Sequence, residues 1–203
     1  ISNNLTNVST PGYKKDRLAF ADLLYANNQN SNQVDGVQAT GATRVGHGAL
    51  VTSAEKDFSM GEFKKTDRAL DLAIRGKGFI EVEIGNGEQA YTRAGALRVD
   101  NDGYLTTSNG YRLSAMIQVP SDAVSLTIEN NGEVFVELPD ETELMSLGVI
   151  DLAAFMNPNA LNPLGQNLYQ PTEDSGEVYF GTAGENGFGE VQQGYLEGSN
   201  VSL

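Results

Sequence analysis

The chain has 203 residues, of which 39% are apolar and 20% are charged, with 23 glycines, one histidine and no cysteine. This length suffices for one or two compact domains, and the composition is typical of a folded protein. Without cysteine the chain forms no disulfide and no thiolate metal site, and a single histidine, His47, excludes sites that need several. We therefore expect no metal and no cofactor.

The net charge of −14 is unevenly distributed along the chain. Residues 1–112 contain all 13 basic and 13 of the 27 acidic side chains, whereas residues 113–203 contain the other 14 acidic side chains and no basic one. Such a one-sign surface repels phosphate backbones and anionic lipids, although its simplest interpretation is a solvated face. We expect no nucleic-acid partner and no membrane insertion, since no run approaches about 18 apolar residues.

Helical spacing occurs at the N-terminal end. Ile1, Leu5 and Val8 lie at i, i+4 and i+7, and Pro11-Gly12 ends the helix that this spacing predicts. At the other end, the pair Ser199-Asn200 is suited to cap a helix. We therefore expect short helical stubs at both termini, as the truncated ends of longer terminal helices.

A second helix and an extended arm are predicted next. Phe20, Leu23 and Leu24 line up at i, i+3 and i+4, which favours a helix within residues 14–25. Residues 27–48 are rich in Asn, Gln, Gly, Thr and Ala and show no apolar periodicity, so we expect a long extended arm there. An arm without an apolar face needs partners elsewhere if it is ordered.

Short alternating segments separated by turn signals predict a mainly β fold, with an antiparallel β domain over residues 66–190. Residues 1–65 plus 191–203 form the connecting region. The expected strands cover 70–74, 79–84, 89–93, 124–128, 134–138 and one long strand in 144–155. Turns are expected at Asn86-Gly87, 100–103, Asn109-Gly110 and 130–132, and loops after residue 155 up to residue 191. The expected core residues are Leu72, Ile74, Phe79, Val82, Ile84, Val99, Leu126, Ile128, Val134, Val136 and Ile150.

Three sequence patterns that could indicate a binding or catalytic site lack the residues or the surroundings that such a site requires. An EF-hand calcium loop starting at Asp100 would need glycine and glutamate where Leu105 and Tyr111 stand. The segment Gly76-Lys77-Gly78 precedes a predicted strand, whereas a dinucleotide-binding loop precedes a helix. Acidic pairs such as Glu81 and Glu83 lie two apart on a wet strand face, with nothing to raise a pKa. We therefore interpret residues 100–103 and 76–78 as turns, and we expect the protein to have no enzymatic activity.

Motifs at both ends carry a resemblance to a known family. Residues 2–14 read SNNLTNVSTPGYK and residues 194–201 read GYLEGSNV; they resemble the opening and closing signatures of the flagellar basal-body rod and hook protein family. Segments 70–79, 91–95 and 167–169 follow the family's order, so the resemblance spans the chain. The length leaves little room for the extra outer domain of hook proteins. The distal rod branch is therefore the nearest likeness, with proximal rod and hook-type proteins as alternatives.

The resemblance implies a structural subunit of the bacterial flagellum basal body. It would polymerise helically into a rigid hollow rod that spans the periplasm and transmits torque, after type III export without a cleaved signal peptide. Its implied partners are copies of itself, the adjacent proximal rod and hook proteins, and the surrounding outer ring bushing, with the β domain as outer surface. Candidate subunit-interface residues are Asn3, Asn4, Leu5, Asn7, Val8, Tyr13, Tyr25, Val34, Val37, Val45, Leu196, Asn200 and Val201. The alternative from another class is a cell-wall-binding or cell-wall-processing protein.

Overall fold

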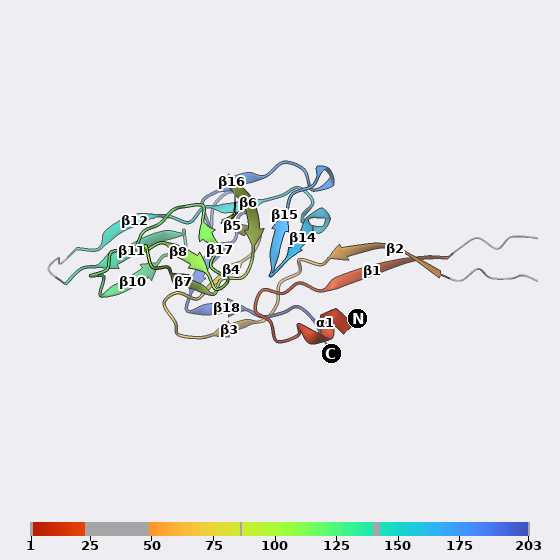
Figure 1. Ribbon diagram of the computed structural model, residues 1–203, viewed down its shortest axis with the longest axis horizontal. Coiled ribbons are helices and arrows are strands. Elements are labelled where there is room, and N and C mark those ends of the chain that lie inside the picture. Colours follow the sequence, from red (N-terminus) through yellow and green to blue (C-terminus); the bar gives the residue numbers. More distant parts are fainter. Residues whose placement is uncertain (1, 23–48, 86, 140–142, 203) are drawn as a thin grey trace, which may run out of the picture. The chain divides into compact units, whose positions relative to one another are not determined.

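The computed structural model describes residues 2–22, 49–85, 87–139 and 143–202, and the side chains of all of these except 18–22 and 49–54 (Figure 1). The chain forms two compact units, one made of residues 1–16 and 56–203 and the other of residues 17–55. The predicted mainly β, antiparallel fold is confirmed, whereas the predicted arm at 27–48, with His47, lies outside the described residues. The first unit contains α1 (Ser2–Thr6), β3 (Phe63–Lys65), β4 (Leu72–Arg75), β5 (Phe79–Ile84), β6 (Glu88–Thr92), β7 (Leu97–Val99), β8 (Leu105–Thr107), β9 (Arg112–Leu113), β10 (Ser125–Ile128), β11 (Glu133–Glu137), β12 (Met145–Val149), β13 (Leu152–Ala154), η1 (Pro158–Ala160), β14 (Asn162–Gly165), β15 (Leu168–Gln170), η2 (Glu173–Ser175), β16 (Tyr179–Gly181), β17 (Glu190–Gln193) and β18 (Tyr195–Glu197).

The second unit is built on a two-stranded sheet of β1 (Asp16–Asp22) and β2 (Ala49–Lys56). The predicted helix within residues 14–25 is therefore wrong up to Asp22. A helix of this length is marginal in water unless its apolar face is packed. Strand β1 instead pairs with a segment that lies far along the chain, and a local sequence window does not contain that partner.

The main sheet has nine strands, with the order β14-β15-β6-β5-β9-β8-β7 and with β13 pairing to both β5 and β16. The hairpin of β5 and β6 is antiparallel, with Val82 opposite Ala90, as the sequence predicts. Under this sheet lies the apolar core, in which Leu72, Ile80 and Leu152 are at most 1% exposed. Strand β4, however, belongs to a separate pair with β17.

Residues 144–155 do not form one long strand, so that prediction is wrong. Strand β12 pairs with β11 in the three-stranded sheet β10-β11-β12, whereas β13 joins the main sheet. The chain changes sheets at Ile150, whose N–H donates to the carbonyl of Gly132 at 2.8 Å and whose side chain is buried. A largely apolar sequence such as residues 144–155 is compatible with one long strand and equally with two short strands in different sheets, so the sequence alone does not separate these two cases.

The core prediction is largely confirmed, and its exceptions lie on edge strands or at the end of a strand. Val99 is 38% exposed because β7 is the last strand of the main sheet, and Leu97 fills the core there. Ile84 and Leu126 are half-buried. The stretch up to residue 191, predicted to be loops, contains the short strands β14, β15 and β16, so that prediction is wrong there. Strand β14 pairs locally with β15, whereas β15 also pairs with β6, and β16 pairs with β13.

Candidate functional site

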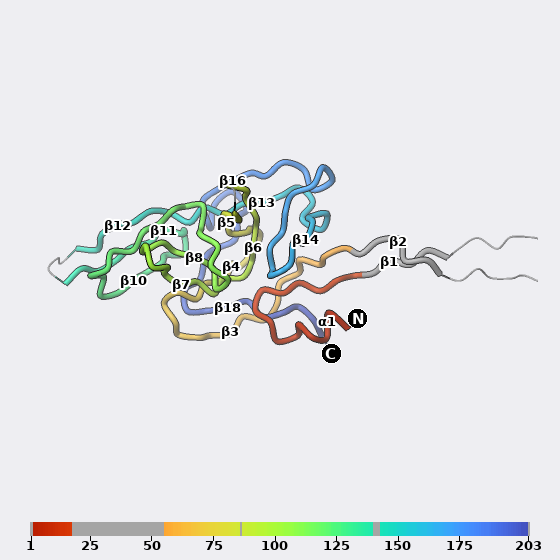
Figure 2. The backbone as a smooth tube through the Cα atoms, in the orientation of Figure 1, coloured from red at the N-terminus to blue at the C-terminus, as the bar shows by residue number. Residues whose placement is uncertain are grey.

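The two ends of the described chain meet beside strand β3 (Figure 2). Strand β18 pairs antiparallel with β3, and the N–H of Gly198 donates to the carbonyl of Glu62 at 2.7 Å. From the other end, the N–H of Gly12 donates to the carbonyl of Glu197, also at 2.7 Å. We call residues 2–16, 56–65 and 195–202, together with Arg93 which contacts them, the terminal junction. Its backbone bonds hold the N-terminal and C-terminal segments side by side.

Two glycines permit this close approach of backbones. Gly12 has φ of 72°, in the left-handed region that glycine adopts without strain, and a Cβ atom there would lie 2.9 Å from Cα of Ala94. A Cβ atom at Gly61 would lie 2.1 Å from the carbonyl oxygen of Gly198. The sequence signal Pro11-Gly12 therefore ends the helix and also lets the chain pass against the β domain.

A buried ion cluster lies inside the terminal junction. Lys14 Nζ is 2.7 Å from Glu197 Oε1, and Arg93 Nε is 2.9 Å from Glu197 Oε2. None of the three residues is more than 4% exposed. Lys14 Nζ also donates to the carbonyl of Ser59 at 2.6 Å, and the N–H of Gly61 donates to Glu197 Oε1 at 3.0 Å. Because buried charges persist only when paired and hydrogen-bonded, these groups hold four chain segments in one arrangement.

Arg93 connects this cluster to the β domain. One guanidinium nitrogen, Nη1, donates to the carbonyls of Gly76 at 3.0 Å and Gly78 at 2.9 Å, and Nη2 donates to the carbonyl of Ile74 at 2.9 Å. The planar fork of arginine supplies five donors, which a lysine cannot match. The predicted turn at Gly76-Lys77-Gly78 is thus a cradle for a guanidinium group.

Burial and the neighbouring charges shift the pKa values of Lys14 and Glu197 in the cluster. Burial lowers the pKa of Lys14, and repulsion by Arg93 adds to this effect although Glu197 opposes it. Burial alone would raise the pKa of Glu197, but Arg93 and Lys14 outweigh burial and leave that pKa below its ordinary value. Glu197 therefore stays ionised at neutral pH, and the cluster depends on this one carboxylate.

Two asparagines act as clamps between segments. Asn4 accepts from the N–H of Asp16 at 2.9 Å and donates to its carbonyl at 3.0 Å. Asn200 accepts from the N–H of Lys15 at 2.8 Å and donates to the carbonyl of Asp57 at 2.7 Å. Asn200 therefore caps no helix, and the helical stub predicted for the C-terminal end is not found within residues 198–202.

The predicted interface residues differ in where the structure places them. Asn4, Tyr13 and Asn200 make hydrogen bonds within the terminal junction, and Tyr13 is buried. Asn3 and Leu5 are exposed, and the partly exposed residues are Asn7, Val8, Leu196 and Val201. Tyr25, Val34, Val37 and Val45 lie outside the described residues.

Sequence reasoning did not find Lys14, Arg93 and Glu197 as a unit. Each lies in a motif that carried the family resemblance, and Arg93 and Glu197 are the one charged residue in their motifs. A single charged residue within each of these two motifs was the one sign in the sequence that Arg93 and Glu197 have a structural role. The sequence did not show that Glu197 pairs with Lys14 and Arg93, because it lies 183 residues from Lys14 and 104 from Arg93.

The terminal junction is suited to holding chain segments rather than to transforming a substrate. Its buried charged groups, Lys14, Arg93 and Glu197, are engaged in ion pairs and in hydrogen bonds to backbone groups. Among the described residues, no group of three or more His, Cys, Asp or Glu side chains is arranged to hold a metal ion. Within the same part of the chain, no helix has the length and apolar character needed to cross a membrane.

Comparisons with known proteins agree with the resemblance of the end motifs. The family model of the flagellar hook protein FlgE/F/G D1 domain matches residues 73–136. The flagellar basal-body rod protein FlgG of Buchnera aphidicola subsp. Schizaphis graminum is 39% identical over 205 residues, which cover 100% of this chain and 79% of the relative. FlgG of Borreliella burgdorferi is 38% identical over 100% of this chain and 78% of the relative, and FlgG of Caulobacter vibrioides is 38% identical over 99% and 78%.

Proposed function

The chain belongs to the FlgG family of flagellar basal-body rod proteins, and on this premise we propose how it builds the rod. It is a structural rod subunit of the bacterial flagellar basal body. In the proposal, copies polymerise helically into the distal rod, a rigid hollow shaft that transmits torque from motor to hook. The rod relatives disfavour the cell-wall-binding alternative.

The observation that carries this proposal is the terminal junction. The buried cluster of Lys14, Arg93 and Glu197 fixes segments from both ends of the sequence on one β domain. Around it, Leu5 is 57% exposed, and the side chains of Val8 and Val201 are partly exposed. Segments held rigidly side by side can present one combined surface to a neighbouring subunit, so little conformational entropy is lost on assembly.

The proposed contacts are those that the end segments leave accessible. We assign the inter-subunit role to residues 1–65 plus 191–203 and the outer rod surface to the β domain of residues 66–190. Asn3, Leu5, Val8, Leu196 and Val201 are the proposed contact residues in the described part. Contacts between two different patches produce an open helical polymer when the rotation from one copy to the next does not close a ring.

The proposal also includes the export route, the location and the neighbouring proteins of the subunit. The subunit would reach a periplasm-spanning rod by type III export without a cleaved signal peptide. Its neighbours would be the adjacent proximal rod and hook proteins and the outer ring bushing. We propose no catalytic role and no cofactor, because the buried charged groups Lys14, Arg93 and Glu197 are paired with one another. We also propose no nucleic-acid or membrane partner, because residues 113–203 contain acidic side chains and no basic one.

Electron microscopy of the purified full-length protein at high concentration tests the proposal. We expect straight hollow tubes from the unchanged protein and none from Leu5→Asp, which places a charge in the proposed contact. The matched control is Val99→Asp, an exposed valine on β7 outside the terminal junction, which should still form tubes. Absence of tubes from the unchanged protein, or equal assembly by Leu5→Asp, would contradict the proposal.

A further inference from the structure

An apolar groove of about 640 Å³ lies on the β domain next to the terminal junction. Its walls include Phe58, Phe79 and Phe155, with ring centroids of Phe58 and Phe79 5.1 Å apart. Two methionines on its lining, Met60 and Met156, are 55% and 83% exposed. An exposed methionine beside buried aromatic rings is adaptable apolar surface that a partner can cover.

A second apolar surface lies at the free end of the sheet β10-β11-β12. Val124 is 64% exposed and Leu144 is 55% exposed. The N–H of Val124 donates to the carbonyl of Glu137 at 2.8 Å, which holds this end of the sheet in place. We call Val124, Leu144 and the partly buried Met145 the apolar tip. Like the groove, it is apolar surface that the described residues leave exposed.

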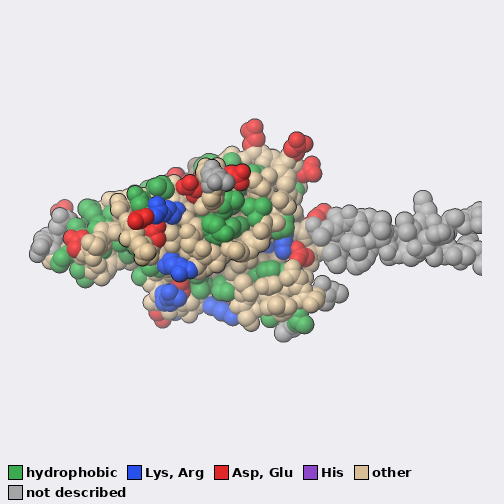
Figure 3. Space-filling view, in the orientation of Figure 1, with side chains coloured by type: hydrophobic (Ala, Val, Ile, Leu, Met, Phe, Trp, Pro, Cys, Tyr) green, Lys and Arg blue, Asp and Glu red, His purple; other side chains and the backbone are tan. Residues whose placement is uncertain are grey.

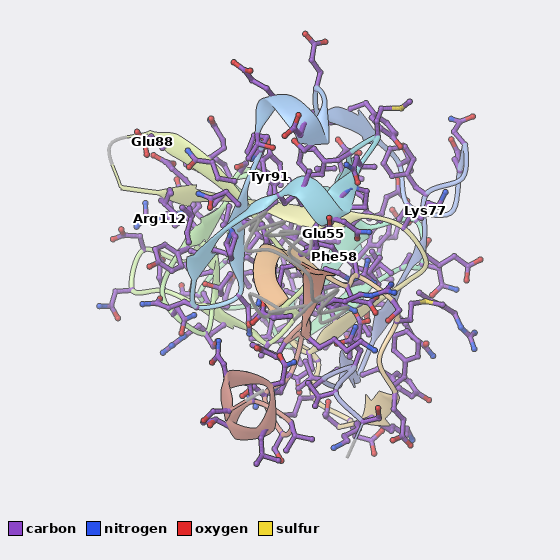
Figure 4. All side chains as sticks on the ribbon, turned by 90° about the vertical axis from the view of Figure 1, so that its right-hand side faces the viewer. Glu55, Phe58, Lys77, Glu88, Tyr91 and Arg112 are labelled. Carbon is purple, nitrogen blue, oxygen red and sulfur yellow. The ribbon has the colours of Figure 1, made fainter. Side chains whose placement is uncertain are left out.

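The charges around the two surfaces are opposite. Lys77 lies exposed on the rim of the groove, on the same side of the unit as Phe58 (Figure 4), and makes no ion pair with any residue that the structure describes. Exposed Glu137 and Glu143 flank the apolar tip, and residues 113–203 contain no basic side chain. Over β10–β12, Figure 3 shows apolar and acidic side chains without a basic one. The tip is therefore complementary to the groove in both polarity and charge.

The tip and groove of one subunit cannot meet each other. Leu144 lies at the free end of the sheet β10-β11-β12, whereas Met156 follows β13 of the main sheet, beyond the change of sheet at Ile150. Figure 2 shows β12 and β13 well apart. The twelve residues from Leu144 to Met156 span at most about 40 Å, at about 3.3 Å per extended residue. Two complementary patches at opposite ends of a unit join successive copies head to tail.

We propose that the apolar tip of one copy occupies the apolar groove of the next copy. Val124 and Leu144 then cover Met156 and Phe58, and Lys77 pairs with the acidic flank of the tip. This contact rests on the proposed function, because it presumes that copies polymerise. It adds to the proposed contacts of Asn3, Leu5, Val8, Leu196 and Val201 a second, lateral contact, formed by the β10–β12 end of one copy and the groove beside the terminal junction of the next.

Disulfide trapping tests this contact, since the chain contains no cysteine of its own. Full-length protein carrying Leu144→Cys and Met156→Cys is assembled, oxidised and run on a non-reducing gel. We expect a ladder of dimers, trimers and longer multiples, because a disulfide needs Cα atoms within about 7 Å and only different copies can supply that. Each single-cysteine variant should remain monomeric. The pair Val99→Cys with Met156→Cys is the matched control and should give no ladder.

A second pair, Leu144→Cys with Met60→Cys, uses the other exposed methionine of the groove and should also give a ladder. Tubes that form normally but yield no ladder from either pair would overturn the tip-and-groove contact while leaving the rod function intact. A ladder from the Val99 control pair would also overturn it, because the trapping would then be unspecific. If the unchanged protein forms no tubes, the proposed function fails and the contact falls with it.

Discussion

The terminal junction and the apolar core of the main sheet are both buried, but they are held together differently. In the core, many interchangeable apolar side chains such as Leu72, Val82 and Leu152 share the stabilisation. In the terminal junction, Lys14, Arg93 and Glu197 each have specific partners at hydrogen-bond distance. We therefore expect the core to tolerate the exchange of one apolar side chain for another of similar volume. Removal of one charged group of the terminal junction should instead lower the free energy of unfolding strongly.

The largest expected effect comes from Glu197→Gln. This change removes the negative charge between Lys14 and Arg93 and leaves two buried cations side by side, which costs about 3 to 5 kcal/mol. Denaturant unfolding of the chain measures the loss as a lower free energy of unfolding.

The matched control for that variant is Asp67→Asn. Asp67 pairs with Lys65 at the surface, where both side chains are more than 60% exposed, so the change should cost less than about 1 kcal/mol. Equal losses from the buried and the exposed carboxylate would show that the ion cluster does not stabilise the fold.

Conservative exchanges sharpen the comparison between the two regions. Arg93→Lys keeps the charge but loses hydrogen bonds to the carbonyls of Gly76, Gly78 and Ile74, which should cost about 1.5 to 3 kcal/mol. Leu152→Met conserves volume in the core and should cost less than about 1.5 kcal/mol. Thermal unfolding of both variants compares them directly, and a smaller loss for Arg93→Lys would contradict the expected order.

Acidification should weaken the terminal junction before the core. Because the pKa of Glu197 in the fold lies below its ordinary value of 4.5, its stabilising effect is complete above that value and is lost as the pH falls through the lowered pKa. A hydrogen bond from the N–H of Ser59 likewise lowers the pKa of Asp57. We expect the free energy of unfolding to fall as the pH drops below about 4.5, by an amount set by how far the fold lowers the pKa of Glu197.

That fall should be shallower in Glu197→Gln, which has no carboxyl to protonate at this position. The free energy of unfolding, measured at each pH for both proteins, provides the comparison. Parallel curves would assign the acid sensitivity to other carboxylates.

The smallest expected effect is that of Asn200→Ala. The variant loses the hydrogen bonds with Lys15 and Asp57 in a partly exposed place, which should cost about 1 kcal/mol. Asn101→Ala, at an exposed asparagine in a turn, is the control and should change the free energy of unfolding by less than about 0.5 kcal/mol. A thermal shift assay resolves this difference.

Local patterns predicted the parts of the fold that depend on neighbouring residues. The hairpins around Gly87 and Gly132 form where turn residues follow alternating strands, and both glycines adopt positive φ. The N-terminal helix ends before Pro11-Gly12 as expected. Where strands pair across long separations, as β1 with β2 or β15 with β6, the same reasoning gave a helix or a loop.

The sequence by itself determined the mainly β class, most of the apolar core and the family resemblance, because alternation, turn chemistry and short motifs are local properties. Only the tertiary structure decided that Lys14, Arg93 and Glu197 are one cluster and that Asn4 and Asn200 are clamps. It also decided that residues 144–155 serve two sheets. The physical reason is that a buried charge is identified by its partner, and the partner here lies more than a hundred residues away.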